Sequence, residues 1–190
     1  MKIVCLNGSP KKKGNTATMI EVFCETADEL GANTETIHLN SLSYRGCQGC
    51  GACKGKLDHC VLKDDLAEVL DKVKDADVLL MGSPIYFGEV TSQMKGFIDR
   101  TYSYLTPDFY TSKTPSRLDP DKTLIMFIPQ GAPDAESFCD VYPRYASFFK
   151  WFGYEKRYEV RGLGMGAPED VLKNDELLEQ IRNVAREILG

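Results

Sequence analysis

The sequence predicts an α/β fold in which a parallel five-stranded sheet carries helices on both of its faces. Short apolar runs alternate along the chain with longer amphipathic segments, which is the rhythm of repeated βα units. The 190 residues fit one ordinary domain, and no internal repeat or low-complexity stretch interrupts the pattern. Apolar residues make up 43% of the chain and charged residues 27%, as in a globular protein. We therefore expect a single domain over residues 1–190, with a cysteine-rich loop at 44–63.

The first half of the chain supplies three strands and two helices. The apolar run at 3–6 reads as a buried strand, and the next segment as a helix that closes at Gly31, because glycine readily takes the left-handed conformation after a helix end. A later helix places Leu66, Val69, Leu70 and Val73 on one face. We expect strands at 3–6, 34–39 and 78–81, and helices at 16–30 and 64–74.

The second half continues the alternation. Met94, Phe97, Ile98, Tyr102 and Leu105 are spaced to line one face of a helix that begins near residue 91. We expect strands at 123–128 and 154–161, and further helices at 138–152 and 169–189. Five βα units suit a flavodoxin-like three-layer sandwich with strand order 2-1-3-4-5. The stretch 106–121 has three prolines and no periodicity, so we expect it to cover a site or to join an oligomer interface.

Charge and apolar runs narrow the range of partners. A net charge of -5 and the lack of a Lys/Arg stripe give no general attraction to nucleic acid or to an anionic membrane. The N-terminal apolar run is too short for a secretory signal, so we expect a cytoplasmic protein. In a reducing cytosol its seven cysteines would serve as thiols, metal ligands or catalytic groups. His38 and His59 are the only histidines, which excludes a multi-histidine metal site.

The loop after the first strand reads Gly8-Ser9-Pro10-Lys11-Lys12-Lys13-Gly14-Asn15-Thr16. It lies at the start of a helix, where backbone N–H groups and the helix dipole attract a phosphate, and where Ser9, Asn15 and Thr16 could donate to its oxygens. The spacing fits neither the nucleotide P-loop nor the dinucleotide glycine pattern, so a mononucleotide phosphate fits better. The alternative is a capped helix preceded by a solvated lysine loop.

Two more loops follow strands at the same edge of the sheet. Residues 83–90 contain Pro84, which stiffens a turn, and Tyr86 and Phe87, which can contact a planar ring. The backbone from Ile85 to Gly88 could hydrogen-bond to the edge of such a ring. Gln130 and Gly131 belong to the loop after the fourth strand, where the glycine permits close approach of the backbone. Residues 162–166, although glycine-rich, read as a plain turn after the last strand.

Through GSPKKKGNT and SPIYFGEVTSQMKGFIDR, the chain resembles the NAD(P)H-dependent FMN reductases of flavodoxin fold. The resemblance implies flavin mononucleotide (FMN) with its phosphate on Ser9, Lys11, Asn15 and Thr16 and its ring system against residues 84–88. Gln130 and Gly131 are further cofactor-binding candidates. In such enzymes NAD(P)H is the co-substrate and the flavin carries the chemistry, so we expect no catalytic side chain.

A third motif, Cys47-x2-Cys50-x2-Cys53-x6-Cys60, lies between the second strand and second helix. Four soft thiolates suit an iron-sulfur cluster or tetrahedral zinc; redox-active or purely structural thiols are the other interpretations. The motif resembles that of the iron-sulfur flavoprotein branch, which implies a 4Fe-4S cluster on these four residues. The longer final gap and the lack of proline after Cys60 depart from the ferredoxin pattern.

The sequence therefore predicts an oxidoreductase that moves electrons from NAD(P)H or a redox partner, through FMN and a 4Fe-4S cluster, to a small-molecule or redox-protein acceptor. One alternative is a non-enzymatic, flavodoxin-like electron carrier, and another is a zinc-stabilised binding protein. The resemblance also implies a homodimer or homotetramer. Cys5 and Cys24 are expected in the core, where an unpaired cysteine behaves as a small apolar residue.

Overall fold

The computed structural model, which describes residues 1–190, contains a parallel five-stranded sheet with order β2-β1-β3-β6-β7. Its strands are β1 (Lys2–Asn7), β2 (Asn33–His38), β3 (Val78–Gly82), β6 (Lys122–Pro129) and β7 (Tyr154–Gly162). Counted along this sheet alone, the order is 2-1-3-4-5, so the predicted flavodoxin-like topology is confirmed. The strand order reverses direction at β1, which pairs with β2 on one side and with β3 on the other.

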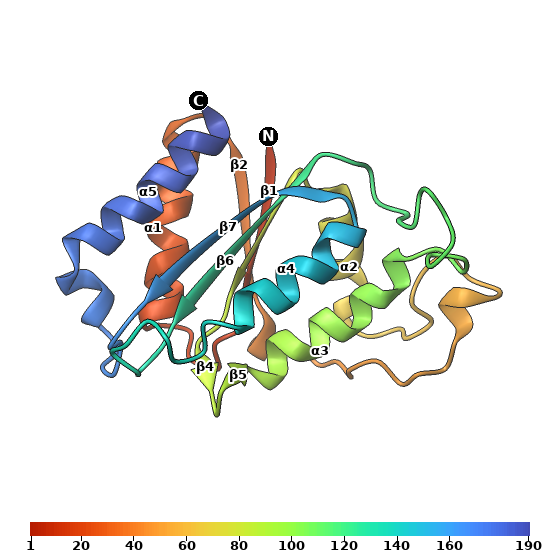
Figure 1. Cartoon of the computed structure of the whole chain (residues 1–190), viewed down its shortest axis with the longest axis horizontal. Coiled ribbons are helices and arrows are strands. Elements are labelled where there is room, and N and C mark those ends of the chain that lie inside the picture. The colour runs from red at the N-terminus through yellow and green to blue at the C-terminus, as the bar shows by residue number, and fades with distance from the viewer.

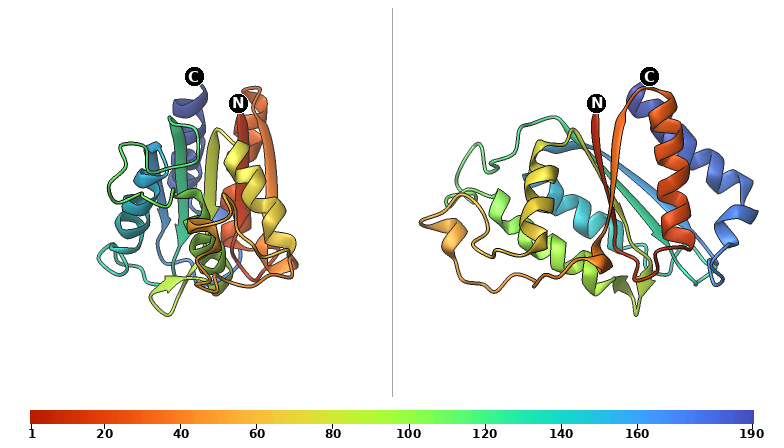
Figure 2. Two further views of the ribbon diagram at one scale, coloured as in Figure 1. Left: turned by 90° about the vertical axis from the view of Figure 1, so that its right-hand side faces the viewer. Right: turned by 180° about the vertical axis from the view of Figure 1, so that it is seen from behind.

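Five helices cover the two faces of the sheet (Figures 1 and 2). They are α1 (Asn15–Glu29), α2 (Asp65–Asp75), α3 (Ser92–Arg100), α4 (Val141–Trp151) and α5 (Asp175–Leu189). Helices α1 and α5 pack together on one face, while α2, α3 and α4 lie on the other (Figure 1). Both chain termini lie near the amino-terminal ends of the parallel strands, and the loops after β1 and β3 leave from the carboxyl-terminal ends (Figure 1). None of the helices combines the length and the apolar character of a membrane-spanning segment.

The sheet separates two apolar cores, because successive residues of a strand point to opposite faces. Val4 and Leu6 of β1 join the core under α2, α3 and α4, whereas Ile3 and Cys5 join the core under α1 and α5. All four side chains are fully buried. Burial on both faces explains why this strand reads as one continuous apolar run in the sequence.

The structure departs from the sequence prediction in three places. The expected loop after β3 contains a hairpin of two short strands, β4 (Ile85–Tyr86) and β5 (Glu89–Val90). Helix α3 ends at Arg100 and continues as the 3-10 turn η3 (Thr101–Tyr104). The last helix begins at Asp175 rather than near 169, because the Asn174 side chain accepts a hydrogen bond from Leu177 N and caps it. Other element ends differ by a few residues.

Candidate functional site

A cavity of about 270 Å³ opens at the carboxyl-terminal edge of the sheet, beside the point where the strand order reverses. The loops after β1, β3, β6 and β7 all contribute to it. Its lining residues are Ser9, Lys11, Gly14, Asn15, Thr16, Pro84, Ile85, Tyr86, Pro129, Gly131, Met165, Gly166, Ala167 and Pro168. Lys11 is the only charged residue among them, so the cavity suits an anionic group.

The loop after β1 ends in an exposed helix N-terminus. Gly14 precedes α1 with a φ of 138°, and no atom lies within 4 Å of the position that a side chain would occupy there. Because glycine cannot cap the helix with a side chain, the first N–H groups of α1 stay available to a ligand. The Ser9 hydroxyl accepts a hydrogen bond from Lys11 N at 3.1 Å, which fixes the turn that leads into the helix.

The Asn15 side chain, which the sequence predicts to donate to a phosphate, is already bonded within the protein. Its Nδ2 donates to Ala167 O at 2.8 Å, and its Oδ1 accepts from Val171 N at 3.2 Å. These two bonds tie the start of α1 to the loop after β7. Asn15 therefore shapes the cavity wall with its amide, while Thr16 is buried beside it and also lines the cavity.

The loops after β1 and β3 are joined by buried hydrogen bonds. Thr91 Oγ1 donates to Gly8 O at 2.6 Å and accepts from Met94 N at 3.2 Å, which caps α3. Ser83 Oγ accepts from Thr91 N at 3.0 Å. A side chain at Gly8 would come within 2.9 Å of Met94 Cβ, so the close approach of these elements requires glycine there. This side of the cavity is consequently rigid before any ligand binds.

The β4–β5 hairpin carries an aromatic side chain at its tip. Phe87 and Gly88 both have positive φ, 52° and 84°, as a two-residue hairpin turn of type I′ requires. A bulky residue pays a steric cost in this conformation, and the Phe87 side chain is nevertheless fully exposed. Strained, exposed residues of this kind concentrate at binding sites. Pro84, Ile85 and Tyr86 line the cavity itself, while Phe87 and Gly88 lie beyond it.

Gln130 faces into the protein and organises the loop after β6. Its Nε2 lies within 3.1–3.3 Å of the carbonyl oxygens of Ala132, Asp134 and Ser137, and its Oε1 accepts from Arg161 at 2.6 Å. The side chain is 1% exposed and does not line the cavity. Gly131 does line it, and nothing lies within 4 Å of its missing side-chain position.

Sequence reasoning missed the segment 165–168, whose four residues line the cavity. The overlapping glycine-rich stretch 162–166 reads in the sequence as a plain turn. Met165 N donates to Gln130 O at 2.8 Å, which brings the loop after β7 against the loop after β6. The signal that could have identified the segment is its position, since it follows the carboxyl end of a parallel strand just as the other three loops do.

The cysteine-rich loop leaves the sheet beside the cavity and runs along α3 to the far end of that helix (Figures 1 and 2). A buried ion pair closes its neck: Arg100 is 0% exposed and lies 2.9 Å from Asp64 Oδ2. Arg100 also donates to the carbonyl oxygens of Arg45 and Leu62, one on each side of the loop. Partial burial by itself would raise the pKa of Asp64, but Arg100 and the Arg45 N–H outweigh it and hold that pKa below its usual value.

The four motif cysteines do not converge. Cys47 and Cys50 are exposed, Cys53 and Cys60 are half-buried, and no three His, Cys, Asp or Glu side chains form a metal-binding group. The donors are thiols and so fit iron-sulfur or zinc chemistry, yet their arrangement here is not that of an assembled site. Gly49 and Gly51 have positive φ, which lets the chain turn sharply between the cysteines.

Two cationic side chains hold the part of this loop around Cys53 against the stretch 106–121 and the end of η3. Lys54 Nζ lies 3.9 Å from Cys53 Sγ and donates to Leu105 O at 2.7 Å. Arg117 donates to Cys53 O at 3.0 Å and to Leu105 O at 2.6 Å. The stretch that was expected to cover a site or join an interface therefore braces the cysteine-rich loop. Phe109 and Tyr110 of the same stretch pack against Trp151 of α4, with a tilted and an edge-on ring contact respectively.

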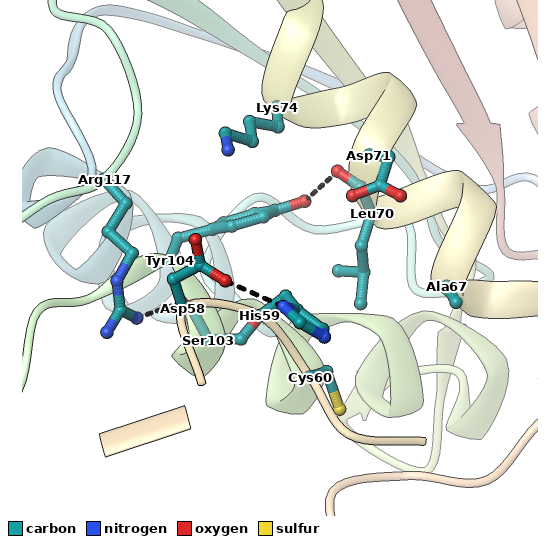
Figure 3. Close-up of a pocket in the computed structure, with 10 residues that line it drawn as sticks. All are labelled: Asp58, His59, Cys60, Ala67, Leu70, Asp71, Lys74, Ser103, Tyr104 and Arg117. Atoms are coloured by element: carbon teal, nitrogen blue, oxygen red, sulfur yellow. Dashed lines mark hydrogen bonds and ion pairs between the residues drawn. The ribbon is translucent and has the colours of Figure 1, made fainter. Parts of the chain in front are cut away.

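Cys60 lines a second cavity, of about 320 Å³, between this loop, α2 and η3 (Figure 3). Lys74 and Arg117 contribute positive charge to its wall, and Asp58 and Asp71 contribute negative charge. His59 Nδ1 lies 2.8 Å from Asp58 Oδ1, and both side chains are exposed. The balanced charges give this cavity no preference for an anion, unlike the cavity at the strand ends.

Comparison with known proteins connects this geometry to flavoproteins. The model of the NADPH-dependent FMN reductase family matches residues 1–114. An iron-sulfur flavoprotein of Archaeoglobus fulgidus is 44% identical over 102 residues, which cover 53% of this chain and 49% of that protein. An iron-sulfur flavoprotein of Methanocaldococcus jannaschii is 39% identical over 101 residues, covering 53% and 52% of the two chains. The chain thus spans about half the length of the curated relatives it matches.

Solved structures share the fold over the whole chain. An FMN-dependent NADH-azoreductase from Bacillus anthracis, in complex with FMN, has a TM-score of 0.74 at 17% identity and covers 100% of both chains. An NAD(P)H:quinone oxidoreductase from Methanothermobacter marburgensis has a TM-score of 0.74 at 19% identity, covering 99% of this chain and 96% of that one. At such low identity these neighbours establish the fold alone.

Proposed function

This chain belongs to the NADPH-dependent FMN reductase family, and on that premise we propose that it is an FMN-dependent oxidoreductase that accepts electrons from NAD(P)H. The observation that carries the proposal is the cavity at the strand ends. Four loops meet there around a helix N-terminus, with one lysine, no carboxylate and an exposed aromatic residue on the adjoining hairpin. That combination suits a phosphate joined to a planar ring.

The residues divide the binding of FMN between them. The N–H groups at the start of α1, the Thr16 hydroxyl and the Lys11 ammonium would hold the phosphate, while Ser9 and the Asn15 amide fix the loops around it. Pro84 to Gly88 would support one side of the ring. Gly131 lets the backbone of another loop approach closely. When bound, FMN supplies the hydride-accepting chemistry, so the protein needs to position it and not to provide a nucleophile.

We further propose that Cys47, Cys50, Cys53 and Cys60 bind a 4Fe-4S cluster, which supplies one-electron chemistry. The support is a donor set of four thiols in one glycine-containing loop, together with the iron-sulfur flavoprotein names of relatives at up to 44% identity. Because the thiols lie apart, cluster binding has to draw them together, as often happens when metal binding orders a loop. Lys54 would offset part of the thiolate charge beside Cys53.

Several features of the whole protein belong to the same proposal. The electron acceptor is a small molecule or a redox protein, and the assembly is a homodimer or homotetramer. A cytoplasmic location suits a chain with seven cysteines, none of them in a disulfide. A flavodoxin-like carrier differs from an oxidoreductase in one measurable property, because it would not react with a nicotinamide.

FMN binding is tested with two lysines of one loop. Lys11 lines the cavity and Lys13 does not, although both are exposed. We expect Lys11→Ala to weaken FMN binding by roughly 3- to 10-fold, as for a partly screened charge contact, and Lys13→Ala to change it much less. Thr16→Val should weaken it by roughly 10-fold or more through a lost charged hydrogen bond. Titration of FMN into each apoprotein measures this, and equal affinities for all variants would contradict the phosphate assignment.

The reaction itself is tested by mixing the FMN-loaded protein with NADH or NADPH in an anaerobic stopped-flow instrument. Loss of the flavin absorbance, followed by its return when a quinone is added, is the expected result. If neither nicotinamide reduces the flavin, but a reduced ferredoxin does, the protein is an electron carrier instead.

The cluster is tested by anaerobic reconstitution with iron and sulfide. Wild-type protein should take up about four irons per chain and gain a paramagnetic signal on reduction. Cys50→Ser should lose most of the iron while it still binds FMN, because the two sites use different loops. Cys139→Ser, which removes an exposed cysteine outside the motif, is the matched control and should retain the iron. Stoichiometric zinc in place of iron would identify a structural zinc site.

A further inference from the structure

Two cysteines outside the motif face each other between β1 and α1, the two elements that the candidate phosphate loop joins. Cys5 of β1 and Cys24 of α1 have their Sγ atoms 3.6 Å apart. Cys5 is fully buried in the core under α1 and α5, whereas Cys24 is only partly buried at the edge of that core. The sequence suggested a purely apolar role for both, but their contact places two thiols within reach of each other.

The two thiols are not equivalent. The hydrogen bond from Cys5 lowers the pKa of Cys24, and it has the opposite effect on Cys5, whose pKa burial raises further. Thr36 Oγ1, on the neighbouring strand β2, lies 3.7 Å from Cys24 Sγ and also favours its thiolate. The thiolate therefore forms more readily on the accessible partner, which is the arrangement of an attacking cysteine beside a resolving one.

We propose that Cys5 and Cys24 form a reversible disulfide, a redox modification site that links β1 to α1 on the two sides of the phosphate loop. With a hydroperoxide as oxidant, the Cys24 thiolate attacks the peroxide oxygen and becomes a sulfenic acid, releasing one water after protonation. Cys5 then attacks the sulfenic sulfur, losing its proton, and a second water leaves. Two thiols and one hydrogen peroxide thus give one disulfide and two waters, and a dithiol reductant reverses the change.

The geometry makes this step local. The two sulfur atoms must approach from 3.6 Å to about 2.05 Å for the bond to form. The bond would enclose residues 6–23, which include Ser9, Lys11 and Thr16 of the candidate site. Closing a loop of this length restricts the unfolded chain, so we expect the oxidised apoprotein to melt roughly 5–10 °C higher. None of this depends on FMN binding.

Peptide mapping tests the proposal on the full-length protein. Trypsin places Cys5 in a peptide of residues 3–11 and Cys24 in a peptide of residues 14–45, and neither contains another cysteine. After mild hydrogen peroxide treatment and alkylation, we expect these two peptides joined, lighter than their sum by two hydrogens and separable with dithiothreitol. Cys24→Ser should leave the peptide 3–11 reduced, and Cys139→Ser should leave the joined species unchanged.

Two outcomes would overturn the proposal. One is overoxidation of Cys24 to a sulfinic acid while Cys5 stays a free thiol, since a resolving thiol in reach should intercept the sulfenic acid. The other is that the peptides 3–11 and 14–45 stay separate with both thiols free, because the accessible Cys24 thiolate should react with the peroxide. Cys24→Ala provides a second variant in case the serine hydroxyl disturbs the core.

Discussion

The cavity at the strand ends and the cysteine-rich loop are held in place in different ways. The cavity is lined by loops that emerge from four adjacent strands, so the hydrogen bonds of the sheet already fix where each loop begins. The loop at 44–63 has no regular strand or helix apart from one short 3-10 turn. It is held at its neck by Arg100 and Asp64 and at its tip by Lys54 and Arg117.

The difference explains why one candidate site looks complete and the other does not. A site at the ends of parallel strands inherits its geometry from the fold and exists before the ligand arrives. Four thiolates in one loop repel one another, so the metal is needed to bring these ligands together. In this protein the Arg100 contacts across the neck hold the ends of the cysteine-rich loop in place, as the sheet does for the loops that line the cavity.

The largest expected effect comes from breaking the neck of the cysteine-rich loop. Asp64→Asn leaves the Arg100 guanidinium fully buried without its counter-charge, which should lower the free energy of unfolding by about 3–5 kcal/mol at neutral pH. Asp99→Asn is the matched control on α3, because its partner Lys95 is exposed and such pairs contribute at most about 1 kcal/mol. Urea titration of both variants measures the difference. Similar losses of stability would contradict a larger contribution from the buried Arg100–Asp64 pair.

The pH dependence of the same pair provides a second check. The folded-state pKa of Asp64 is depressed, so its contribution is complete above the unfolded pKa of about 3.9 and is lost as the pH falls through the lower folded value. Wild type should therefore lose stability below about pH 4 more steeply than Asp64→Asn does, and the gap between them should narrow. A gap that stays constant down to pH 2 would contradict the charge pairing.

Much of the cavity could be predicted because its signals are local. Strand periodicity predicted the sheet. The loops at Ser9, Pro84 and Gly131 were predicted to bind a ligand because each follows a strand, and all three line the cavity. The sequence could not show that the Asn15 amide bonds to Ala167, or that Gln130 faces Arg161, because both partners are remote along the chain. The hairpin at 85–90 was missed for another reason: its turn is Phe-Gly, and phenylalanine at the first position is not one of the residues that usually adopt positive φ.

The sequence predicted the cysteine-rich loop from its cysteine spacing, but it did not predict how the loop folds. The spacing of Cys47 to Cys60 predicted four candidate metal ligands, and nothing in it indicated that Arg100, far along the chain, would close the loop. Arg100 sits on the helix whose apolar face was recognised, but one buried arginine has no periodic signature. Long-range ion pairs of this kind become visible only in the folded chain.

A smaller effect is expected at the rigid side of the cavity. Thr91→Val keeps the shape of the side chain but removes the hydroxyl that links Gly8 O to Met94 N, leaving both buried groups without a partner. We expect a loss of about 2 kcal/mol in stability and a measurable loss of FMN affinity. Thr111→Val removes an exposed hydroxyl that bonds to Asp108 O and should cost less than about 0.5 kcal/mol. Chemical denaturation and FMN titration distinguish the two, and a stable Thr91→Val protein with normal affinity would show that the loops are held by other contacts.

The smallest effect on stability, and the sharpest separation of stability from binding, is expected at the tip of the β4–β5 hairpin. Phe87→Asn creates an Asn-Gly turn, which adopts positive φ with less strain, so the apoprotein should gain about 0.5–1 kcal/mol. If Phe87 is retained at this cost because it contacts the flavin ring, the same variant should bind FMN more weakly. Tyr110→Asn is the control, since it removes an exposed aromatic side chain beside the cysteine-rich loop and should leave FMN binding unchanged. A Phe87→Asn protein that is more stable and binds FMN as wild type does would remove Phe87 from the site and leave Pro84 to Tyr86 as the support for the ring.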